Sequence, residues 1–243
     1  MKNDLYLSVV IPVYNEENRI EAALTDVFGY LSGIPEKWEV IIADDGSRDR
    51  TAEIVKTWQQ KHPELKYIAA PRNQGKGAAV QRGMSRASAR WRLFRDADSS
   101  TAMKEFDHFR PHLDRGAPIV IGSRRVAGAT FVNHQPWLRE TLGRGFTLLC
   151  RCLLVWEIRD YTCGFKCFSA EAAEKIFPRQ RIFRWGFDSE ILFVAKTLGY
   201  PIIQEPVTWS HDTGTKVHLF KDVLASFWEI ICIRTNSLRG LYR

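Results

Sequence analysis

The residues best suited to chemistry in this sequence are Asp96 and Asp98, which follow the apolar residues Leu93 and Phe94. The pattern predicts a strand that delivers carboxylates to its carboxyl-terminal end, where open α/β sheets bind their ligands. Alternate side chains of an extended segment share a face, so Asp96 and Asp98 would point the same way while Ala97 packs behind them. Hard oxygen donors on one face suit Mg²⁺ or Mn²⁺, although an isolated Asp-x-Asp is more typical of a solvated turn.

The composition indicates one α/β domain with an anionic partner. The chain has 243 residues, of which 45% are hydrophobic, so it is long enough to bury a full core. We expect residues 1–243 to form a single domain. The net charge of +7 favours nucleotides, phosphates, nucleic acid or an anionic membrane surface, and it also fits a merely soluble basic protein.

The cysteines and the N-terminus favour a cytosolic protein with reduced thiols. The sequence has 5 Cys without paired metal-type spacing, and its first residues contain no signal-peptide core. The apolar stretches 146–158 and 223–233 are interrupted by Arg151 and Glu229 and fall short of the ~20 residues of a membrane span. We therefore expect no transmembrane segment.

The first half of the chain alternates between strand and helix patterns. Apolar runs predict strands at 5–13, 38–43, 65–69, 118–122 and immediately before Asp96, and 3.6-residue periodicity predicts helices at 19–31, up to Gln60, and at 78–87. Right-handed crossovers would place the polar, glycine-containing turns after four or five of these strands on one edge of the sheet. The charge pattern changes near Arg125, which we take as the border between halves 1–125 and 126–243.

The second half predicts longer helices. Residues 131–158 form a mostly helical stretch whose arginines and aromatics fit either an interfacial membrane helix or a core helix with solvated arginines. A strand is expected near 163–168, where Cys163 and Cys167 would be buried thiols. Helices are expected at 170–176, up to Leu198, and at 219–233, with an extended segment at 200–209.

Several motifs together carry a resemblance to a known family. They are Tyr14-Asn15-Glu16, Asp44-Asp45-Gly46-Ser47, Gly75-Lys76-Gly77, Asp96-Ala97-Asp98, Gly122-Ser123-Arg124 and Cys163-Gly164-Phe165-Lys166. Their order and spacing resemble family 2 glycosyltransferases of the GT-A fold. The second half resembles dolichyl-phosphate β-glucosyltransferases, and dolichyl-phosphate mannose synthases share much of its pattern. Its motifs are Ile158-Arg159-Asp160, the run from Arg184 to Glu190, and Trp209 followed by Gly214-Thr215-Lys216.

The resemblance spans residues 8 to about 234 and implies a mostly parallel sheet flanked by helices, with amphipathic helices in the second half. It implies that Asp44 contacts the base, that Lys76 lies near the phosphates and that Gly75 permits close backbone approach, as Gly77 does. Asp98 would bind the metal, and Asp96 would support it or hold the sugar. The nucleotide-sugar residues implied are Pro12, Tyr14, Glu16, Asp44, Asp45, Gly75, Lys76, Asp96 and Ala97.

The resemblance also implies an acceptor site and a reaction. Arg124 and Arg139 match family arginines that meet phosphate, and Lys216 would join them. Asp188 stands where relatives acting on hydroxyl acceptors keep a base; here it would hold the sugar or the acceptor arginines, or cap a helix. Departures from the mannose synthase pattern are Ser100 in place of Gln near the metal and His211 in place of Arg. Arg125 and Arg144 have no family match and are expected to be solvated.

The reaction implied is inverting transfer of a hexose, glucose being favoured, from a nucleotide-sugar to a polyprenyl or dolichyl phosphate. The catalytic residues implied are Asp96, Asp98, Asp188 and Arg124, with Mg²⁺ or Mn²⁺ as cofactor. Transfer to a hydroxyl of a glycan or lipid is the alternative, and a non-enzymatic binder of acidic lipid or nucleic acid is more remote. Nucleic acid is not an expected partner.

Two amphipathic segments predict how the chain reaches a lipid acceptor. The first is the helical stretch 131–158, in which Arg139, Arg144 and Arg151 interrupt the apolar residues. The last predicted helix carries an apolar face, which is flanked by the basic residues Lys216, Lys221 and Arg234. The residues of this face are Phe220, Val223, Leu224, Phe227, Trp228 and Ile231. We expect a peripheral protein on the cytoplasmic leaflet of a membrane, unless these faces pack on the sheet or on a second subunit in a homo-oligomer.

Overall fold

The chain folds around a seven-stranded sheet, accompanied by a separate two-stranded pair. The computed structural model describes residues 5–98, 100–133, 137–210 and 219–243, and for residues 133, 137–139 and 219–224 it describes the backbone alone. The main sheet contains β1 (Leu5–Val13), β2 (Lys37–Asp44), β3 (Leu65–Ala69), β4 (Trp91–Arg95), β5 (Ile119–Ser123), β7 (Phe165–Ser169) and β8 (Ile203–Pro206). The pair contains β6 (Thr130–Asn133) and β9 (Thr208–Ser210).

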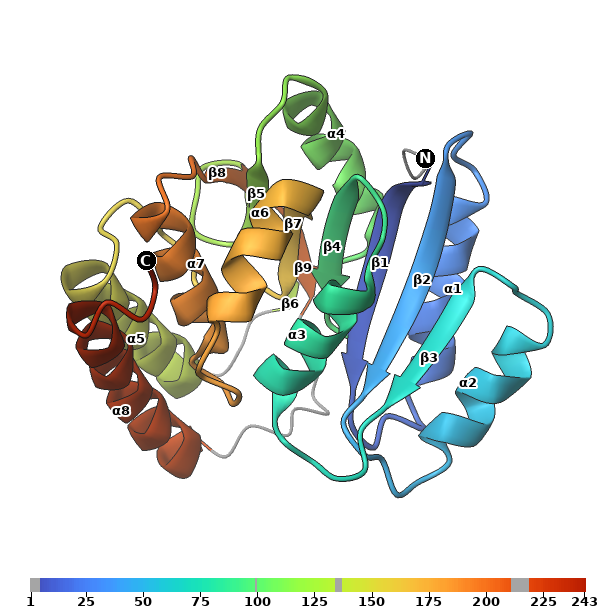
Figure 1. Cartoon of the computed structure of the whole chain (residues 1–243), viewed down its shortest axis with the longest axis horizontal. Coiled ribbons are helices and arrows are strands. Elements are labelled where there is room, and N and C mark those ends of the chain that lie inside the picture. The colour runs from blue at the N-terminus through green and yellow to red at the C-terminus, as the bar shows by residue number, and fades with distance from the viewer. Residues whose placement is uncertain (1–4, 99, 134–136, 211–218) are drawn as a thin grey trace.

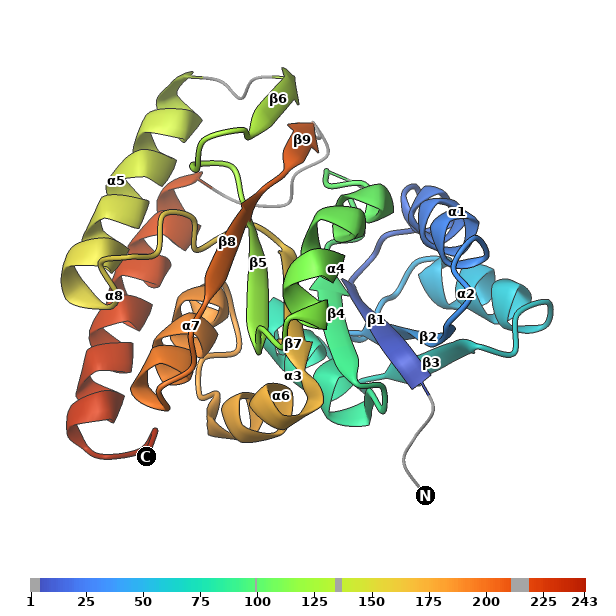
Figure 2. The same ribbon diagram turned by 90° about the horizontal axis from the view of Figure 1, so that it is seen from above.

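Helices cover both faces of the main sheet (Figures 1 and 2). The described helices are α1 (Ile20–Leu31), α2 (Thr51–Gln59), α3 (Lys76–Arg86), α4 (Phe106–Asp114), α5 (Trp137–Leu153), α6 (Ala170–Ile176), α7 (Phe187–Thr197) and α8 (Leu219–Leu238), with short 3₁₀ turns η1 (Met103–Glu105) and η2 (Phe177–Arg179). Side chains alternate along β1, so Val10 enters the core under α3, α6 and α7, whereas Val9 and Ile11 enter the core under α1, α2 and α4.

The strand order is β3-β2-β1-β4-β7-β5-β8, and every pair is parallel except those that β7 makes with β4 and β5. Strands from residues 1–125 and from residues 126–243 thus join the same sheet. The carboxyl ends of the parallel strands share one edge, and β7 begins at that edge because it runs the opposite way. The expected α/β architecture with a mostly parallel sheet is confirmed.

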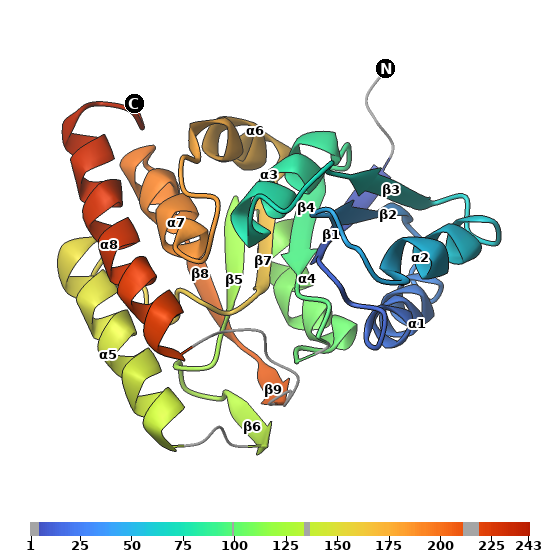
Figure 3. The ribbon, with the colours of Figure 1, turned by 90° about the horizontal axis from the view of Figure 1, so that it is seen from below.

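The helices α5 and α8 pack side by side at one end of the molecule, beyond α7 (Figures 1 and 3). Several large apolar side chains on and near them are exposed, namely Leu148, Leu153, Trp156, Phe227, Trp228, Ile231, Leu238 and Leu241. None of the helices within the described ranges combines the length and apolar character that a membrane span requires. Cys163 and Cys167 are buried free thiols, as expected.

Most predicted elements are confirmed to within a few residues, but residues 131–133 are not helical. They belong to β6, which pairs in parallel with β9, and the helix predicted there begins only at Trp137. The pairing partner lies 77 to 78 residues away along the chain, so local periodicity could not report it. The last helix also runs further than predicted, to Leu238.

Candidate active site

The loops that carry the predicted motifs meet at the edge where the parallel strands end. They follow β1, β2, β3, β4 and β5 and precede β7, and Figure 3 views the molecule from this side. Because β4 pairs with β1 on one side and with β7 on the other, the turn after β4 lies in the middle of the edge. The prediction that polar turns gather on a single edge is confirmed.

Asp96 is the first residue after β4, and its carboxylate lies between a lysine and a glycine. Its Oδ1 lies 2.6 Å from Nζ of Lys76, and its backbone N–H donates to the carbonyl of Gly164 at 3.1 Å. A Cβ at position 164 would come within 2.1 Å of Oδ2 of Asp96. Glycine is therefore required at position 164, because any side chain there would displace the Asp96 carboxylate.

Lys76 begins α3 and places a positive charge beside this carboxylate. Its Nζ lies 6.0 Å from the ring centroid of Trp185 and 5.8 Å from that of Phe187. Burial disfavours the charged amine, but the charges of Asp96 and Asp188 outweigh this effect and raise the pKa of Lys76. Lys76 is therefore an ammonium ion at neutral pH.

Asp98 lies in a turn, which corrects the expected extended geometry. The strand ends at Arg95, and Ala97 and Asp98 form the turn, so alternation of faces does not apply. Ala97 is buried, as predicted. Oδ1 of Asp98 accepts the backbone N–H of Ser100 at 3.0 Å. Burial and the neighbouring charge of Asp96 raise the pKa of Asp98, so a cation close to Asp98 would favour its charged form.

The carboxylates of Asp96 and Asp98 fit a divalent cation in charge and in donor type. Oδ1 of Asp96 is buried and accepts no aligned hydrogen bond, although the ammonium of Lys76 is close. In the part of the chain that the structure describes, no cluster of three or more His, Cys, Asp or Glu side chains could hold a metal. A cation here would complete its coordination with ligands such as phosphate oxygens or water.

The turn after β1 is bonded to the turn after β2. The N–H of Asn15 donates to Oγ of Ser47 at 2.9 Å, and Oδ1 of Asn15 accepts the N–H of Arg48 at 2.8 Å. Asn15 has a φ of 53°, a left-handed conformation that asparagine adopts more readily than most residues. The residues at or next to this turn that were assigned to the nucleotide are Pro12, Tyr14 and Glu16.

Asp44 is buried and organises the turn after β2. Its Oδ1 accepts the N–H and the hydroxyl of Ser47 at 2.8 and 2.7 Å, and its Oδ2 accepts the hydroxyl of Tyr67 at 2.5 Å. With only 1% of the residue exposed, both oxygens are satisfied by the protein itself. Its contact with a base stays a prediction, and the role visible in the structure is to shape the turn.

Gly75 and Gly77 allow another part of the protein to approach the start of α3. A Cβ at position 75 would lie 2.3 Å from the carbonyl oxygen of Phe183, and one at position 77 would lie 2.6 Å from Cβ of Phe187. The expected close approach therefore comes from residues 183–187, which lead into α7. Asp45 is likewise buried, and its Oδ2 accepts the N–H of Gly75 at 2.7 Å, so it supports the loop from behind.

Arg124 follows β5 and binds a buried carboxylate that sequence reasoning left without a role. Its Nε and Nη2 donate to Oδ2 and Oδ1 of Asp160 at 2.7 and 2.8 Å, and Nη2 also donates to Oγ1 of Thr162 at 2.8 Å. Burial opposes ionisation of Asp160, but Arg124 outweighs it and lowers the pKa of Asp160 to about 2. The fork geometry leaves Nη1 of Arg124 for another acceptor.

Asp188 is a buried partner of Lys166. It lies in the first turn of α7, whose N-cap is Gly186, so the capping interpretation of Asp188 is wrong. Its Oδ1 accepts a hydrogen bond from Nζ of Lys166 at 2.5 Å, and Nζ also donates to the carbonyl of Cys163. The glycine-rich Cys-Gly-Phe-Lys motif contains Lys166, but nothing local in the sequence indicates a partner 22 residues away.

Of the remaining predicted acceptor residues, the structure describes only the backbone of Arg139. The side chain of Arg139 and all of Lys216 and His211 lie outside the described residues. Of the arginines expected to be solvated, Arg144 is 69% exposed and pairs with Glu140, which agrees with that expectation. Arg125 is half-buried, so the expectation is wrong for this residue.

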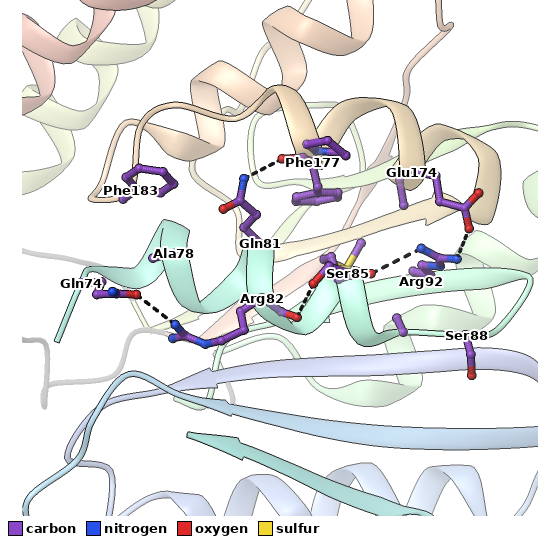
Figure 4. Close-up of a pocket in the computed structure, with 14 residues that line it drawn as sticks. Gln74, Ala78, Gln81, Arg82, Ser85, Ser88, Arg92, Glu174, Phe177 and Phe183 are labelled. Atoms are coloured by element: carbon purple, nitrogen blue, oxygen red, sulfur yellow. Dashed lines mark hydrogen bonds and ion pairs between the residues drawn. The ribbon is translucent and has the colours of Figure 1, made fainter. Parts of the chain in front are cut away.

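A pocket of about 1090 Å³ lies between α3 and the α6–η2 segment (Figure 4). Gln81 crosses it to donate to the carbonyl of Phe177 at 2.7 Å, and Arg92 pairs with Glu174 at its far end. No residue assigned to the donor or the acceptor lines this pocket. The candidate active site is therefore the open edge of the sheet.

The comparison with known proteins agrees with this geometry. Residues 8–177 match the family described as glycosyl transferase family 2, and the match includes the Lys76–Asp96 pair and Asp98. The chain belongs to glycosyl transferase family 2. It is thus a glycosyltransferase, as the resemblance implied, and the non-enzymatic interpretation is wrong.

Similarity over nearly all of this chain extends to dolichyl-phosphate β-glucosyltransferases. The chain is 35% identical to the one from Dictyostelium discoideum over 253 residues, which cover 99% of this chain and 77% of that protein. It is 32% identical to the one from Homo sapiens over 250 residues, covering 98% and 77%. The family 2 enzyme is therefore similar to lipid-phosphate glucosyltransferases in both halves.

Solved structures share the fold at low sequence identity. Glucosyl-3-phosphoglycerate synthase from Mycobacterium tuberculosis, determined with Mn²⁺, UDP and glucosyl-3-phosphoglycerate, superposes with a TM-score of 0.66 at 20% identity, covering 96% of this chain and 79% of that one. Mannosyl-3-phosphoglycerate synthase from Rubrobacter xylanophilus gives 0.70 at 16% identity, covering 97% and 74%. These likenesses confirm the GT-A architecture.

Proposed function

We propose that the protein transfers glucose from UDP-glucose to a dolichyl or other polyprenyl phosphate, with inversion at the anomeric carbon. The observation that carries the proposal is the carboxylate pair at the sheet edge, with the ammonium of Lys76 beside Asp96 and with Arg124 held by Asp160 in the loop after β5. Such an arrangement suits a reaction in which one phosphate group leaves and another attacks. Similarity to dolichyl-phosphate β-glucosyltransferases along the whole chain supports the choice of donor sugar and acceptor.

The reaction needs little acid–base chemistry. A phosphate oxygen of the acceptor forms a bond to the anomeric carbon, and the bond from that carbon to the diphosphate breaks with its electron pair on the leaving UDP. The acceptor phosphate is already an anion at neutral pH, so no proton has to be removed from it. Catalysis therefore consists of positioning and of neutralising charge on the departing diphosphate.

The donor side is built for that neutralisation. Lys76 carries its charge beside Asp96, and the aromatic rings of Trp185 and Phe187 exclude water from one side of the ammonium. A Mg²⁺ or Mn²⁺ ion held by Asp98 and Asp96 would supply further positive charge to the leaving diphosphate. Residues of the β1 and β2 turns would hold the nucleoside.

The position of Asp188 also favours a phosphate acceptor over a hydroxyl acceptor. A general base has to reach the hydroxyl proton it removes. Asp188 is 4% exposed, and its carboxylate is engaged by Lys166. This carboxylate therefore suits a positioning role better than proton abstraction. Transfer to a hydroxyl acceptor would then lack a base at the position where the family keeps one.

The apolar surface of α5 and α8 supports attachment to a membrane. Phe227, Trp228 and Ile231, which the sequence assigned to the apolar face of the last helix, are exposed, and Arg234 is exposed beside them. The side chains of Phe220, Val223 and Leu224 lie outside the described residues. We place this surface in the headgroup layer of the cytoplasmic leaflet, with a second subunit as the alternative occupant.

A panel of nucleotide-sugars tests the proposal. UDP-glucose, GDP-mannose and UDP-N-acetylglucosamine are each incubated with farnesyl phosphate and Mg²⁺, and lipid-linked sugar is extracted and quantified. UDP-glucose should give the highest rate. Transfer only from another donor would contradict the assignment of glucose, and absence of product with every donor while farnesol is glycosylated would contradict the phosphate acceptor.

A further inference from the structure

Arg125, the second arginine after β5, occupies a position that the sequence does not suggest. Its side chain is half-buried against α5, and its Nη2 lies 3.5 Å from the point that a Cβ on Gly143 would occupy. That distance is an ordinary van der Waals contact, so the guanidinium packs directly against this turn of α5. Gly143 lies one turn before Thr147 on the same helix, whose C-terminal part carries the exposed apolar side chains Leu148 and Leu153.

The guanidinium of Arg125 forms no hydrogen bond or ion pair within the described residues; only its backbone N–H is bonded, to Oγ of Ser123. Other described arginines that make no side-chain bond, such as Arg72 and Arg159, are exposed to solvent. Water can satisfy those exposed side chains, whereas a partly buried guanidinium without an acceptor costs free energy. An anionic group at this position would remove the cost.

The neighbouring Arg124 offers an anionic ligand less net positive charge than Arg125 does. Its bidentate contact with Asp160 joins a cation to a buried anion, so the pair is close to neutral. Arg125, in contrast, forms no ion pair with any of the described residues. Burial lowers the pKa of Arg125, and the charges of Arg124 and Arg144 lower it further, whereas the charges of Asp160 and Glu140 oppose this shift.

We infer that Arg125 binds the phosphate of the lipid acceptor, with the Arg124–Asp160 pair fixing the loop that presents it. This inference rests on the proposed function. The electrostatic influence of Asp96 reaches Arg124, so the loop lies close enough to the donor centre for charges to interact. A phosphate on Arg125 would sit between that centre and α5, along which the polyprenyl chain would extend over Leu148 and Leu153.

Arg125→Gln tests the inference, with Arg115→Gln as a matched control. Arg115 is an exposed arginine between α4 and β5, at the opposite edge of the sheet, and its loss changes the net charge equally. Binding of farnesyl phosphate in the presence of UDP is measured by titration calorimetry, and KM values are measured for both substrates. Thermal unfolding confirms that each variant is folded.

Arg125→Gln should weaken farnesyl phosphate binding and raise its KM by roughly 10- to 100-fold, the loss expected for a charge-assisted hydrogen bond. The KM for UDP-glucose should stay within about twofold of wild type, and Arg115→Gln should leave both unchanged. Arg125→Lys should recover part of the binding, because it keeps the charge but loses the fork. Recovery by lysine separates anion binding from a packing role.

Farnesyl phosphate binding equal to wild type in Arg125→Gln and Arg125→Lys would overturn the inference, whatever the turnover. If the wild-type protein transfers glucose to farnesyl phosphate in that case, the proposed function stands and only the role of Arg125 fails. If the wild-type protein binds farnesyl phosphate through Arg125 but transfers no glucose to it, the role of Arg125 stands and the proposed function fails.

Discussion

At the scale of single residues, the candidate site contains two pairs of opposite charges beside carboxylate Asp98. Asp96 faces Lys76, and Asp160 faces Arg124. Within the described residues Asp98 forms no ion pair, and burial together with Asp96 raises its pKa. A bound cation would stabilise this carboxylate, so we assign the direct metal contact to Asp98.

We expect Asp98→Asn to lower glucosyl transfer by roughly 100-fold or more, because the metal loses an anionic ligand. The free energy of unfolding without metal should stay the same or rise, because the substitution removes a charge that the folded state disfavours. Initial rates over a range of Mg²⁺ concentrations and urea unfolding measure both. Asp114→Asn, at an exposed position on α4, is the control. Wild-type turnover of Asp98→Asn at saturating Mg²⁺, or full wild-type activity in EDTA, would count against the metal site.

The Arg124–Asp160 pair predicts a dependence of stability on pH. The pKa of Asp160 is about 2 in the folded protein, against about 3.9 in an unfolded chain. A lowered carboxyl pKa adds stability that is fully present above pH ~4 and is lost as the pH falls through about 2, with a size of ~2 kcal/mol. Urea unfolding between pH 5 and pH 2, compared with Asp160→Asn, measures this contribution.

Asp160→Asn should lose several kcal/mol at neutral pH, because it leaves Arg124 buried without its anion, and its stability should fall less steeply below pH ~4. An identical slope in both proteins would mean that Asp160 is not held ionised by Arg124.

The sequence was sufficient to locate Asp96, Asp98, Lys76 and Arg124 at one sheet edge, because strand order and crossover handedness decide where motifs meet. The sequence could not reveal that the guanidinium of Arg124 is hydrogen-bonded to the carboxylate of Asp160. That contact joins residues 36 apart through a bidentate geometry that exists only in the folded chain. Arg125 was expected to be solvated because it has no matching arginine in the family, and its packing against α5 is a contact between distant residues that the sequence does not show.

At the scale of elements, the start of α3 is held by packing that permits only glycine. A Cβ at position 77 would lie 2.6 Å from Cβ of Phe187, 2.9 Å from Nε2 of Gln180 and 2.9 Å from the carbonyl of Ile182. These atoms belong to the segment that leads into α7. A shift of the segment that leads into α7 would therefore also move the start of α3, which carries Lys76.

Gly77→Ala should lower the free energy of unfolding by about 1–3 kcal/mol and weaken UDP-glucose binding, because the inserted methyl separates α3 from α7. The matched control is Gly29→Ala, on the exposed face of α1, where an added Cβ meets nothing within 4 Å. That variant should be more stable by about 0.4–1 kcal/mol, since alanine restricts the unfolded chain. Urea unfolding of both variants measures the difference. Equal stability of the two would show that the space at Gly77 is not restrictive.

The periodicity of apolar residues predicted those helices and strands whose pattern and boundaries are local. It failed for a strand that depends on pairing with a distant part of the chain. The strand 65–69 and the helix 170–176 were predicted to the residue, because their apolar patterns and boundaries are local. The strand β6 exists through its pairing with β9, so residues 131–133 could not be distinguished from the helix that follows them. Beyond the end of α8, the hydroxyl of Tyr242 donates to buried Glu190 at 2.5 Å, a contact between residues 52 apart that local periodicity does not report.

At the scale of the whole molecule, the catalytic edge and the apolar α5–α8 surface belong to one body. The sheet connects strands from both halves of the chain, and α8 packs on both α5 and α7 (Figure 1). The sheet therefore shows no division of the chain at residue 125. That residues 1–243 fold as a single domain stays a prediction. A lipid held on the α5–α8 surface would have its phosphate near the catalytic edge.

Trp228, which is 66% exposed on α8, should be a membrane contact. Trp228→Ser is expected to weaken binding to anionic vesicles about tenfold, because burial of one large apolar side chain contributes ~1–2 kcal/mol. Phe183→Ser is the control, since Phe183 is also exposed but lies beside the pocket between α3 and α6 (Figure 4). Flotation with vesicles at low and high salt measures binding. If wild type does not float at any salt, the membrane interpretation is wrong and a second subunit becomes the occupant.

The most direct test of the proposed chemistry is the structure of the product. UDP-glucose labelled with ¹³C at the anomeric carbon is incubated with farnesyl phosphate and Mg²⁺, and the lipid product is examined by nuclear magnetic resonance. We expect the labelled carbon to couple to phosphorus and its proton to show the large coupling of a β-glucoside, because a phosphate oxygen attacks with inversion. An α-linked product, or a labelled carbon in the lipid product without coupling to phosphorus, would contradict this account.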